Sequence, residues 1–209
     1  MHKYNYIVIE GIIGSGKTTL AKKLAEDLNG RLVLEKFEDN PFLPKFYANP
    51  NQFAFPLELS FLAERFQHIS NELSKQDLFS DFTISDYHVM KSLIFASNTL
   101  GEDEQKLFQT LYKIIFQQVP KPNLWLYLHV SPEKARRNIA KRGRTYEKSI
   151  EEDYLRKINS GYLTFFKQQI DQKIVLIDAE KLDFVENRAD YLMIKDLLFK
   201  DHKAGISLV

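Results

Sequence analysis

Cysteine is absent from the 209 residues, which excludes disulfides, thiolate metal sites and cysteine nucleophiles. Neither charge sign is in excess: the formal net charge is +1, so no strong field favours a nucleic-acid polymer or a membrane surface. No apolar run approaches the roughly 20 residues needed to cross a bilayer, and no signal-peptide pattern follows Met1. We therefore expect a cytoplasmic protein with neither nucleic-acid polymers nor membranes as partners.

The composition is that of an ordinary globular protein, 44% hydrophobic and 27% charged, and the length suits one domain over 1–209. Strand-like apolar runs recur between helical patterns, and they are continuous rather than alternating, which is typical of parallel strands covered on both faces. The fold class expected is α/β, three-layer, with a five-stranded parallel sheet. The expected strands are 6–10, 32–37, 82–86, 124–130 and 174–177.

Long helices are expected over 52–77, 103–119 and 149–171, beyond what a simple strand–helix–strand crossover needs. The first carries an apolar stripe at Phe55, Leu59, Leu62, Phe66, Ile69 and Leu73. Such extra helices either build a substrate pocket or a dimer face, or they only pack on the core.

The segment directly after the first expected strand has the pattern G-x-x-x-x-G-K-T. Its glycines allow a tight turn whose backbone N–H groups face a phosphate, and the helix expected over 18–28 adds its positive end. Lys17 can bridge the β- and γ-phosphates, and the Thr18 hydroxyl can bind Mg²⁺. The alternative is a glycine-rich turn that binds nothing. The pattern predicts a P-loop for ATP and Mg²⁺ made of Gly11, Ile12, Ile13, Gly14, Ser15, Gly16, Lys17, Thr18 and Thr19.

A basic segment, residues 136–144, follows the fourth expected strand. Arg142 and Arg144 flank Gly143, which suits a hinged lid over about 136–148 that brings positive charge to the transferring phosphate. The alternative is a solvated basic helix end, favoured there by the macrodipole. The chain lacks the N-K-x-D motif of GTPases, so loop and lid together favour a kinase that acts on a small molecule.

The P-loop, Glu35, residues 38–43 with Lys45-Phe46-Tyr47, and the Arg-Gly-Arg lid together resemble the deoxynucleoside kinase family. The closest resemblance, over about 6–184, is to its bacterial deoxyguanosine and deoxyadenosine kinase branch. It implies a P-loop kinase with a helical lid that uses ATP and Mg²⁺ to phosphorylate the 5′-hydroxyl of a purine deoxynucleoside. Deoxyguanosine is expected first and deoxyadenosine second. A homodimer through the long helices is also implied.

The resemblance assigns roles to individual residues. Glu35 fills the position of the general base that accepts the 5′-hydroxyl proton, while Asp39 competes with it but is better placed to cap a helix. Tyr47 and Glu147 match the residues that hold the sugar 3′-hydroxyl. The donor base is expected near Arg142 and the loop containing Asp183 and Phe184.

Two positions depart from the family pattern. Asp86 keeps an acidic role near Mg²⁺, but Tyr87 stands where much of the family has an arginine, so the missing cation must come from elsewhere, with Lys91 as the candidate. Asn138 stands where a lid arginine is usual, and the adjacent Arg137 points about 100° away on a helix.

Glu58 and Arg65, seven residues apart, share one helix face at the border of the apolar stripe. An ionised carboxylate only accepts, which suits the N1–H and N2–H₂ donors of guanine, while Arg65 suits the guanine O6 and N7 acceptors. The alternative is that these two charges only pair with each other.

Two other functions remain open. A nucleoside monophosphate kinase of the thymidylate kinase type would share the loop, lid and length, but would need extra cations for its substrate phosphate. A non-catalytic nucleotide-binding regulator is compatible with the departures at Tyr87 and Asn138.

Overall fold

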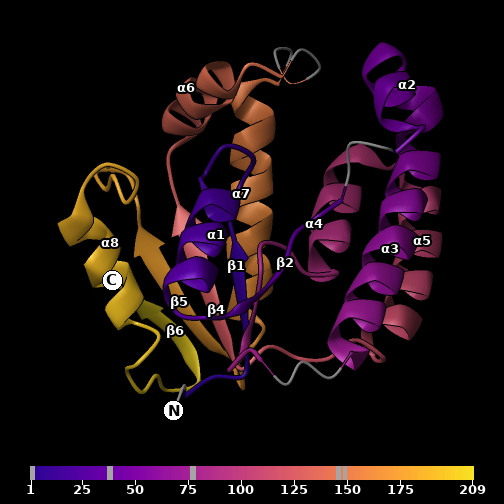
Figure 1. Ribbon diagram of the computed structural model, residues 1–209. Helices are drawn as coiled ribbons and strands as arrows, with labels where there is room; N and C mark the ends of the chain where they lie inside the picture. The colour runs from indigo at the N-terminus through magenta and orange to yellow at the C-terminus, as the bar shows by residue number, and fades with distance from the viewer. Residues whose placement is uncertain (1–2, 37–39, 76–78, 145–146, 148–149) are drawn as a thin grey trace. The chain divides into compact units, whose positions relative to one another are not determined.

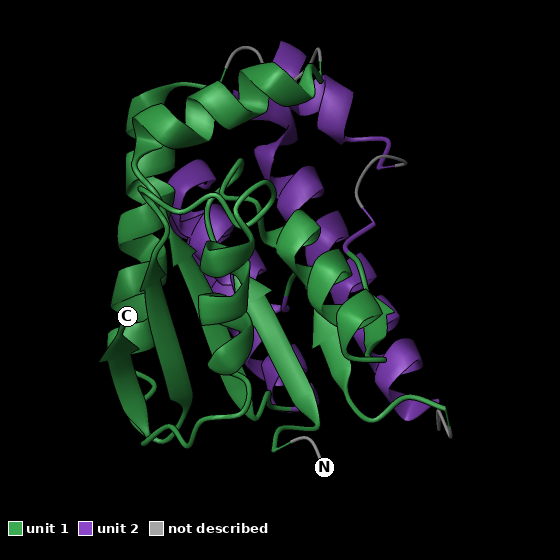
Figure 2. Ribbon diagram, turned by 60° about the vertical axis from the view of Figure 1, so that its left-hand side comes forward, with its two compact units in different colours: residues 1–34, 77–87, 121–209 green, residues 35–76, 88–120 purple. Residues whose placement is uncertain are grey.

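The computed structural model describes residues 3–36, 40–75, 79–144, 147 and 150–209. The chain divides into two compact units (Figure 2). Unit 1 comprises residues 1–34, 77–87 and 121–209, and unit 2 comprises residues 35–76 and 88–120. Each is described by itself.

Unit 1 is built on a six-stranded, fully parallel sheet with the strand order β2-β3-β1-β4-β5-β6 (Figure 1). The strands are β1 Tyr6–Glu10, β2 Arg31–Val33, β3 Thr83–Ser85, β4 Leu124–His129, β5 Lys173–Asp178 and β6 Gly205–Leu208. The α/β class is confirmed, but the expected count of five strands is wrong. β6 was missed because it is a four-residue edge strand with partly exposed side chains, which gives no continuous apolar run.

The second strand is shorter than expected, ending at Val33 rather than at residue 37. It lies at the edge of the sheet and pairs with β3 over three residues, so Glu35 lies in the segment after the strand rather than at its end. The expected β1 bounds are confirmed, and the bounds of β3, β4 and β5 differ from the expected ones by one residue at one or both ends.

Helices cover both faces of the sheet in unit 1. They are α1 Lys17–Asp27, α6 Pro132–Arg142, α7 Glu152–Lys167 and α8 Arg188–Asp196. Trp125 and Tyr127 of β4 pack against Phe166 of α7, with ring centroids 5.7 and 5.4 Å apart. Leu126 and Leu128 alternate with them toward the opposite face and are fully buried as well. β1 lies at the centre, where the chain order reverses, and ligands bind beside such a switch point in open α/β sheets.

Unit 2 is helical, with α2 Leu43–Ala48, α3 Pro50–Ser74, α4 Met90–Thr99 and α5 Glu102–Phe116. The buried face of α3 comprises Ala54, Leu57, Glu58, Phe61, Leu62, Arg65 and Ile69. Glu58 and Arg65 are therefore in the middle of the buried face, not at its border as expected, and their partners on neighbouring segments make that burial possible. Among the described helices, none is long and apolar enough to cross a membrane.

Candidate functional site

The loop between β1 and α1 has the backbone geometry of a phosphate-binding turn. Gly14 and Gly16 have φ values of 83° and 93°, a region that residues with a Cβ rarely adopt. A Cβ on Gly14 would lie 2.5 Å from the carbonyl oxygen of Ala135, so substitution there meets backbone as well. These two glycines are thus required by the turn itself.

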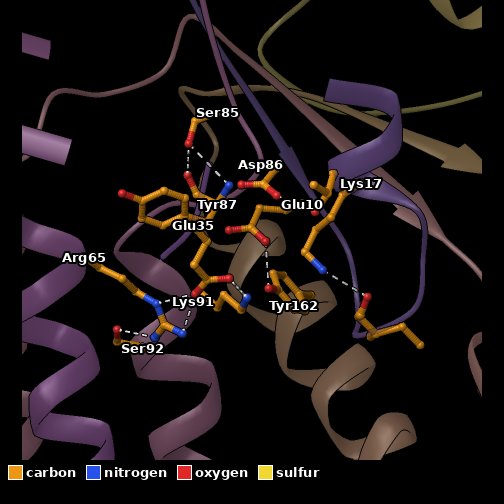
Figure 3. A network of polar contacts seen from close by, with 12 residues as sticks. Glu10, Lys17, Glu35, Arg65, Ser85, Asp86, Tyr87, Lys91, Ser92 and Tyr162 are labelled. Atoms are coloured by element: carbon orange, nitrogen blue, oxygen red, sulfur yellow. Dashed lines mark hydrogen bonds and ion pairs between the residues drawn. The ribbon is translucent and has the colours of Figure 1, made fainter. Parts of the chain in front are cut away.

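The amino end of α1 is left open toward the loop. The helix starts at Lys17 directly after Gly16, and no described side chain caps it. Its first N–H groups and its dipole therefore suit an anion. Lys17 Nζ donates to the Ile12 carbonyl at 3.3 Å, which folds the side chain back over the loop (Figure 3).

Thr18 and Asp86 are brought together in unit 1 as the sequence predicted. The Thr18 hydroxyl donates to Asp86 Oδ2 at 2.5 Å, and Asp86, directly after β3, is 4% exposed. A hydroxyl and a carboxylate are hard oxygen donors of the kind that Mg²⁺ accepts, together with water and substrate phosphates. The donor set fits the ion, although the described residues contain no group of three His, Cys, Asp or Glu that could hold a metal alone.

Both predicted lid arginines contact Glu147. Arg142 donates to Glu147 Oε2 through Nε at 3.1 Å and Nη2 at 2.5 Å, and Arg144 Nη1 lies 3.5 Å from Oε1. Gly143 between them ends α6 with a φ of 78°. Glu147 is 5% exposed and holds both lid arginines, while its expected contact with a sugar hydroxyl stays a prediction.

Asn138, the departure from the expected lid arginine, has a different partner. Its Nδ2 donates to the Gly14 carbonyl at 2.8 Å, which ties α6 to the P-loop. Arg137 is exposed on α6.

The two residues predicted to lie near the donor base, both in the loop after β5, make different contacts. Phe184 is buried against the P-loop, since a Cβ on Gly16 would lie 2.8 Å from its ring. Asp183 instead organises its own turn, accepting from the backbone N–H groups of Val185 and Glu186 at 3.1 and 3.0 Å. These hydrogen bonds lower the pKa of the Asp183 carboxyl.

A buried acid just before the P-loop was missed from the sequence. Glu10 is fully buried at the end of β1, and Tyr162 of α7 donates to its Oε2 at 2.8 Å (Figure 3). In the sequence, Glu10 was recognisable only as a charged residue at the end of an apolar strand. The bond joins α7 to the strand that carries the P-loop.

In unit 2, Glu35 lies between two cations (Figure 3). Arg65 Nε and Nη2 both lie 2.8 Å from Glu35 Oε1, and Lys91 Nζ lies 2.5 Å from Oε2. All three side chains are at most 8% exposed. Arg65 is further held by Ser92, whose Oγ accepts from Nη1 at 2.7 Å, a contact that the sequence did not indicate.

Lys91 therefore supplies a cation beside the predicted base, as expected from the absence of an arginine at position 87. Tyr87 itself is 1% exposed, and its backbone N–H and carbonyl are both engaged by the Ser85 hydroxyl. Its phenol adds no positive charge. The cation reaches Glu35 from the first turn of α4 instead.

Glu58 has a partner other than Arg65. Its Oε1 lies 3.0 Å from the Thr99 hydroxyl at the end of α4, while its Oε2 is buried with no hydrogen-bond partner among the described residues. Burial raises the pKa of this carboxyl to about 7, opposed by the charges of Arg65 and Lys91 and by the Thr99 hydrogen bond. The alternative that Glu58 and Arg65 only pair with each other is not what the structure shows. Thr99 gave no sequence signal.

Tyr47 lies half-buried in α2, with its ring edge-on to Phe46 at 5.6 Å between centroids. It belongs to unit 2 and Glu147 to unit 1, so their joint role stays a prediction. Asp39, the acid expected to cap a helix, lies outside the described residues.

Comparison with known proteins gives a consistent result. The model of a family described as deoxynucleoside kinase matches residues 7–201. The chain is 35% identical to the deoxyguanosine kinase of Bacillus subtilis, across 91% of this chain and 94% of that protein. It is 31% identical to the deoxyadenosine kinase of Dictyostelium discoideum, across 91% of this chain and 78% of that protein.

Among solved structures, a deoxyadenosine kinase from M. mycoides with bound dATP superposes with a TM-score of 0.80 at 24% identity. The match covers 93% of this chain and all of that chain. At this identity, the likeness shows that the two proteins share a fold.

Proposed function

The chain belongs to the deoxynucleoside kinase family, and we propose that it transfers the γ-phosphoryl group of ATP to the 5′-hydroxyl of a purine deoxynucleoside. Deoxyguanosine is the preferred substrate and deoxyadenosine the second. The observation that carries the proposal is Glu35, a buried carboxylate held by Arg65 and Lys91 in a chain that also has a complete P-loop. The family match spans both compact units, which supports one functional domain over 1–209.

Unit 1 is proposed to hold the phosphate donor. The backbone N–H groups of residues 11–19 and the Lys17 ammonium bind the β- and γ-phosphates, and Phe184 with Asp183 borders the donor base. Arg142 and Arg144 then leave Glu147 in part and spread positive charge over the transferring group. The open amino end of α1 and the hinge at Gly143 support these roles.

Thr18 and Asp86 are the residues that would hold Mg²⁺ in this proposal, the former through its hydroxyl and the latter through its carboxylate. When bound, the ion neutralises charge that develops on the phosphate oxygens. Without it, the chain's own contribution is the short Thr18–Asp86 hydrogen bond, which keeps both donors on one side of the P-loop.

Unit 2 is proposed to hold the acceptor. Glu35 accepts the proton of the 5′-hydroxyl while the 5′-oxygen forms a bond to the γ-phosphorus and the bond to the β,γ-bridging oxygen breaks, releasing ADP. Arg65 and Lys91 fix the orientation of the Glu35 carboxylate. Tyr47 and Glu147 bind the 3′-hydroxyl, and Glu58 with Arg65 faces the base.

A second copy of this chain is the proposed protein partner. Leu107 and Ile114 of α5 are 53% and 56% exposed, and their seven-residue spacing puts them on one helix face. Such a patch suits burial against its own copy through a two-fold axis.

The proposal places the enzyme in the cytoplasm, where ATP and Mg²⁺ are supplied.

The test is a panel of acceptors with γ-labelled ATP: the four deoxynucleosides, guanosine and thymidine monophosphate. Label transfer to deoxyguanosine and more slowly to deoxyadenosine is expected. Transfer to thymidine monophosphate alone would favour the thymidylate kinase alternative, and binding of ATP without transfer to any acceptor would favour the non-catalytic one.

A further inference from the structure

Glu58 carries a buried oxygen that lacks a hydrogen-bond partner. The residue is 3% exposed, its Oε1 is engaged by Thr99, and its Oε2 has none among the described residues. Buried polar atoms are nearly always hydrogen-bonded, because an unpaired one keeps the full cost of its desolvation. Four buried side-chain atoms among the described residues lack a partner, and Glu58 Oε2 is the one that belongs to a carboxyl group. Because a carboxyl oxygen is the most costly of these to leave unpaired, we infer that its partner arrives with a ligand.

The spacing of two residues along α3 can be compared with the length of a nucleoside. Arg65, which holds Glu35, lies seven residues after Glu58 on the same buried face of α3. Two turns of helix correspond to a rise of about 10 Å, comparable to the span of a nucleoside from its 5′-oxygen to the far edge of its base. With the 5′-hydroxyl at Glu35, the base edge can reach Glu58.

Thr99 can accommodate Glu58 in either protonation state. Its Oγ1 lies 3.0 Å from Glu58 Oε1 and 3.1 Å from the carbonyl oxygen of Phe95. When Glu58 is ionised, the Thr99 proton is donated to Oε1. When Glu58 is neutral with its proton on Oε2, Thr99 still donates to Oε1, and the carboxyl proton stays available to a ligand. The hydroxyl thus fits both forms, and its hydrogen bond favours the ionised one by lowering the pKa of Glu58.

The surrounding groups leave the two forms close in free energy near neutral pH. Burial disfavours the ionised carboxyl, while Arg65 on α3 and Lys91 on α4 favour it, which leaves the Glu58 pKa raised to about 7. Both cations are themselves paired with Glu35. From α5, Tyr112 is the buried titratable group, and burial raises its pKa so that it stays neutral.

We propose that the protonation state of Glu58 selects between the two purine bases, with the ionised form accepting guanine and the neutral form accepting adenine. This rests on the proposed function. The ionised carboxylate has acceptors only, and guanine presents N1–H and N2–H₂ donors. The neutral carboxyl offers one donor to adenine N1 and one acceptor to the 6-amino group.

The test is the ratio of kcat/KM for deoxyguanosine to that for deoxyadenosine, measured from about pH 5.5 to about pH 8.5. Adenine N1 titrates well below this window and guanine N1 only slightly above it, and the ratio cancels every ionisation that affects both substrates equally. The ratio should rise about tenfold with pH, the size of one base-edge hydrogen-bonded pair, around a midpoint near 7.

Three variants make the assignment specific. Glu58→Gln should give a ratio that does not change with pH, because the amide does not titrate. Thr99→Val should move the midpoint of the ratio to higher pH, because it removes a hydrogen-bond donor to the ionised carboxylate. Glu72→Gln, on the last turns of the same helix, is the matched control and should keep the parent profile. A ¹³C carboxyl spectrum of the parent, compared with Glu58→Gln, locates the Glu58 titration independently of activity.

The outcomes separate the two proposals. A flat ratio in the parent while both nucleosides are phosphorylated, or a pH-dependent ratio that persists in Glu58→Gln, overturns the role of Glu58 and leaves the kinase assignment standing. Failure to phosphorylate any deoxynucleoside at any pH overturns the proposed function instead.

Discussion

The Lys91 ammonium and the Glu35 carboxylate form a buried ion pair, 2.5 Å from Nζ to Oε2, with both side chains at most 8% exposed. Arg65 occupies the other carboxylate oxygen at 2.8 Å. Held from both sides, the carboxylate has a fixed orientation. The cation that position 87 does not carry comes from Lys91 in the first turn of α4.

Lys91→Met should destabilise the fold and lower turnover. Removing one member of an isolated buried pair typically costs about 3–5 kcal/mol of unfolding free energy, and the loss should be smaller here because Arg65 still pairs with Glu35. Thermal unfolding and kcat for deoxyguanosine are the measurements. The double variant Lys91→Met with Glu35→Gln should be inactive and less stable than Lys91→Met, because Arg65 then loses its carboxylate partner; a double variant more stable than Lys91→Met would contradict the pairing of Arg65 with Glu35.

Glu35→Gln should bind deoxyguanosine nearly as the parent does but lose about 10²–10⁴ in kcat, the usual contribution of a positioned general base. The amide cannot accept the 5′-hydroxyl proton, while its shape is kept. Calorimetric Kd and single-turnover rates separate binding from chemistry. A rate within threefold of the parent would show that Glu35 is not the base.

Asn138→Ala should weaken ATP binding without affecting the nucleoside. The variant removes the 2.8 Å hydrogen bond from α6 to the Gly14 carbonyl, with a net contribution of about 0.5–1.5 kcal/mol, or roughly two- to tenfold in KM for ATP. KM for deoxyguanosine is the internal control. An equal change in both KM values would mean that Asn138 acts on the whole fold rather than on the P-loop.

Glu58→Gln, assayed at about pH 8, where the parent carboxyl is ionised, should shift purine preference toward deoxyadenosine. The expected change in the ratio of specificity constants is about ten- to hundredfold, or roughly 1–3 kcal/mol. Glu58→Ala should instead impair both purines. Deoxycytidine serves as the third substrate, and an unchanged purine ratio in Glu58→Gln would remove the guanine-reading role.

The sequence predicted the conformation of the loop after β1 well, because the glycines in the motif determine the backbone there. The P-loop glycines and the helix after them follow from local pattern, whereas Asp86, which contacts Thr18, was singled out only through the family resemblance. The family resemblance drawn from these motifs was confirmed. The fold class could also be predicted from the sequence. A short edge strand such as β6 has too few buried residues to be recognised.

The polar contacts of unit 2 were less predictable, because they join residues far apart in the chain. Neither Ser92 nor Thr99 stands out in the sequence, yet one holds Arg65 and the other Glu58. For the same reason the predicted buried face of α3 did not include Glu58 and Arg65. Charged residues in a helical pattern are assigned to the surface unless the residues that pair with them are known.

The most direct measurement of the central claim follows the label of γ-³²P-ATP into deoxyguanosine and locates the phosphate on the product. The parent should yield deoxyguanosine 5′-monophosphate. Lys17→Ala should yield none while unfolding at the parent's temperature, because the lysine charge is used at the phosphates. Normal turnover in folded Lys17→Ala, or no labelled deoxynucleoside from the parent, would contradict the account.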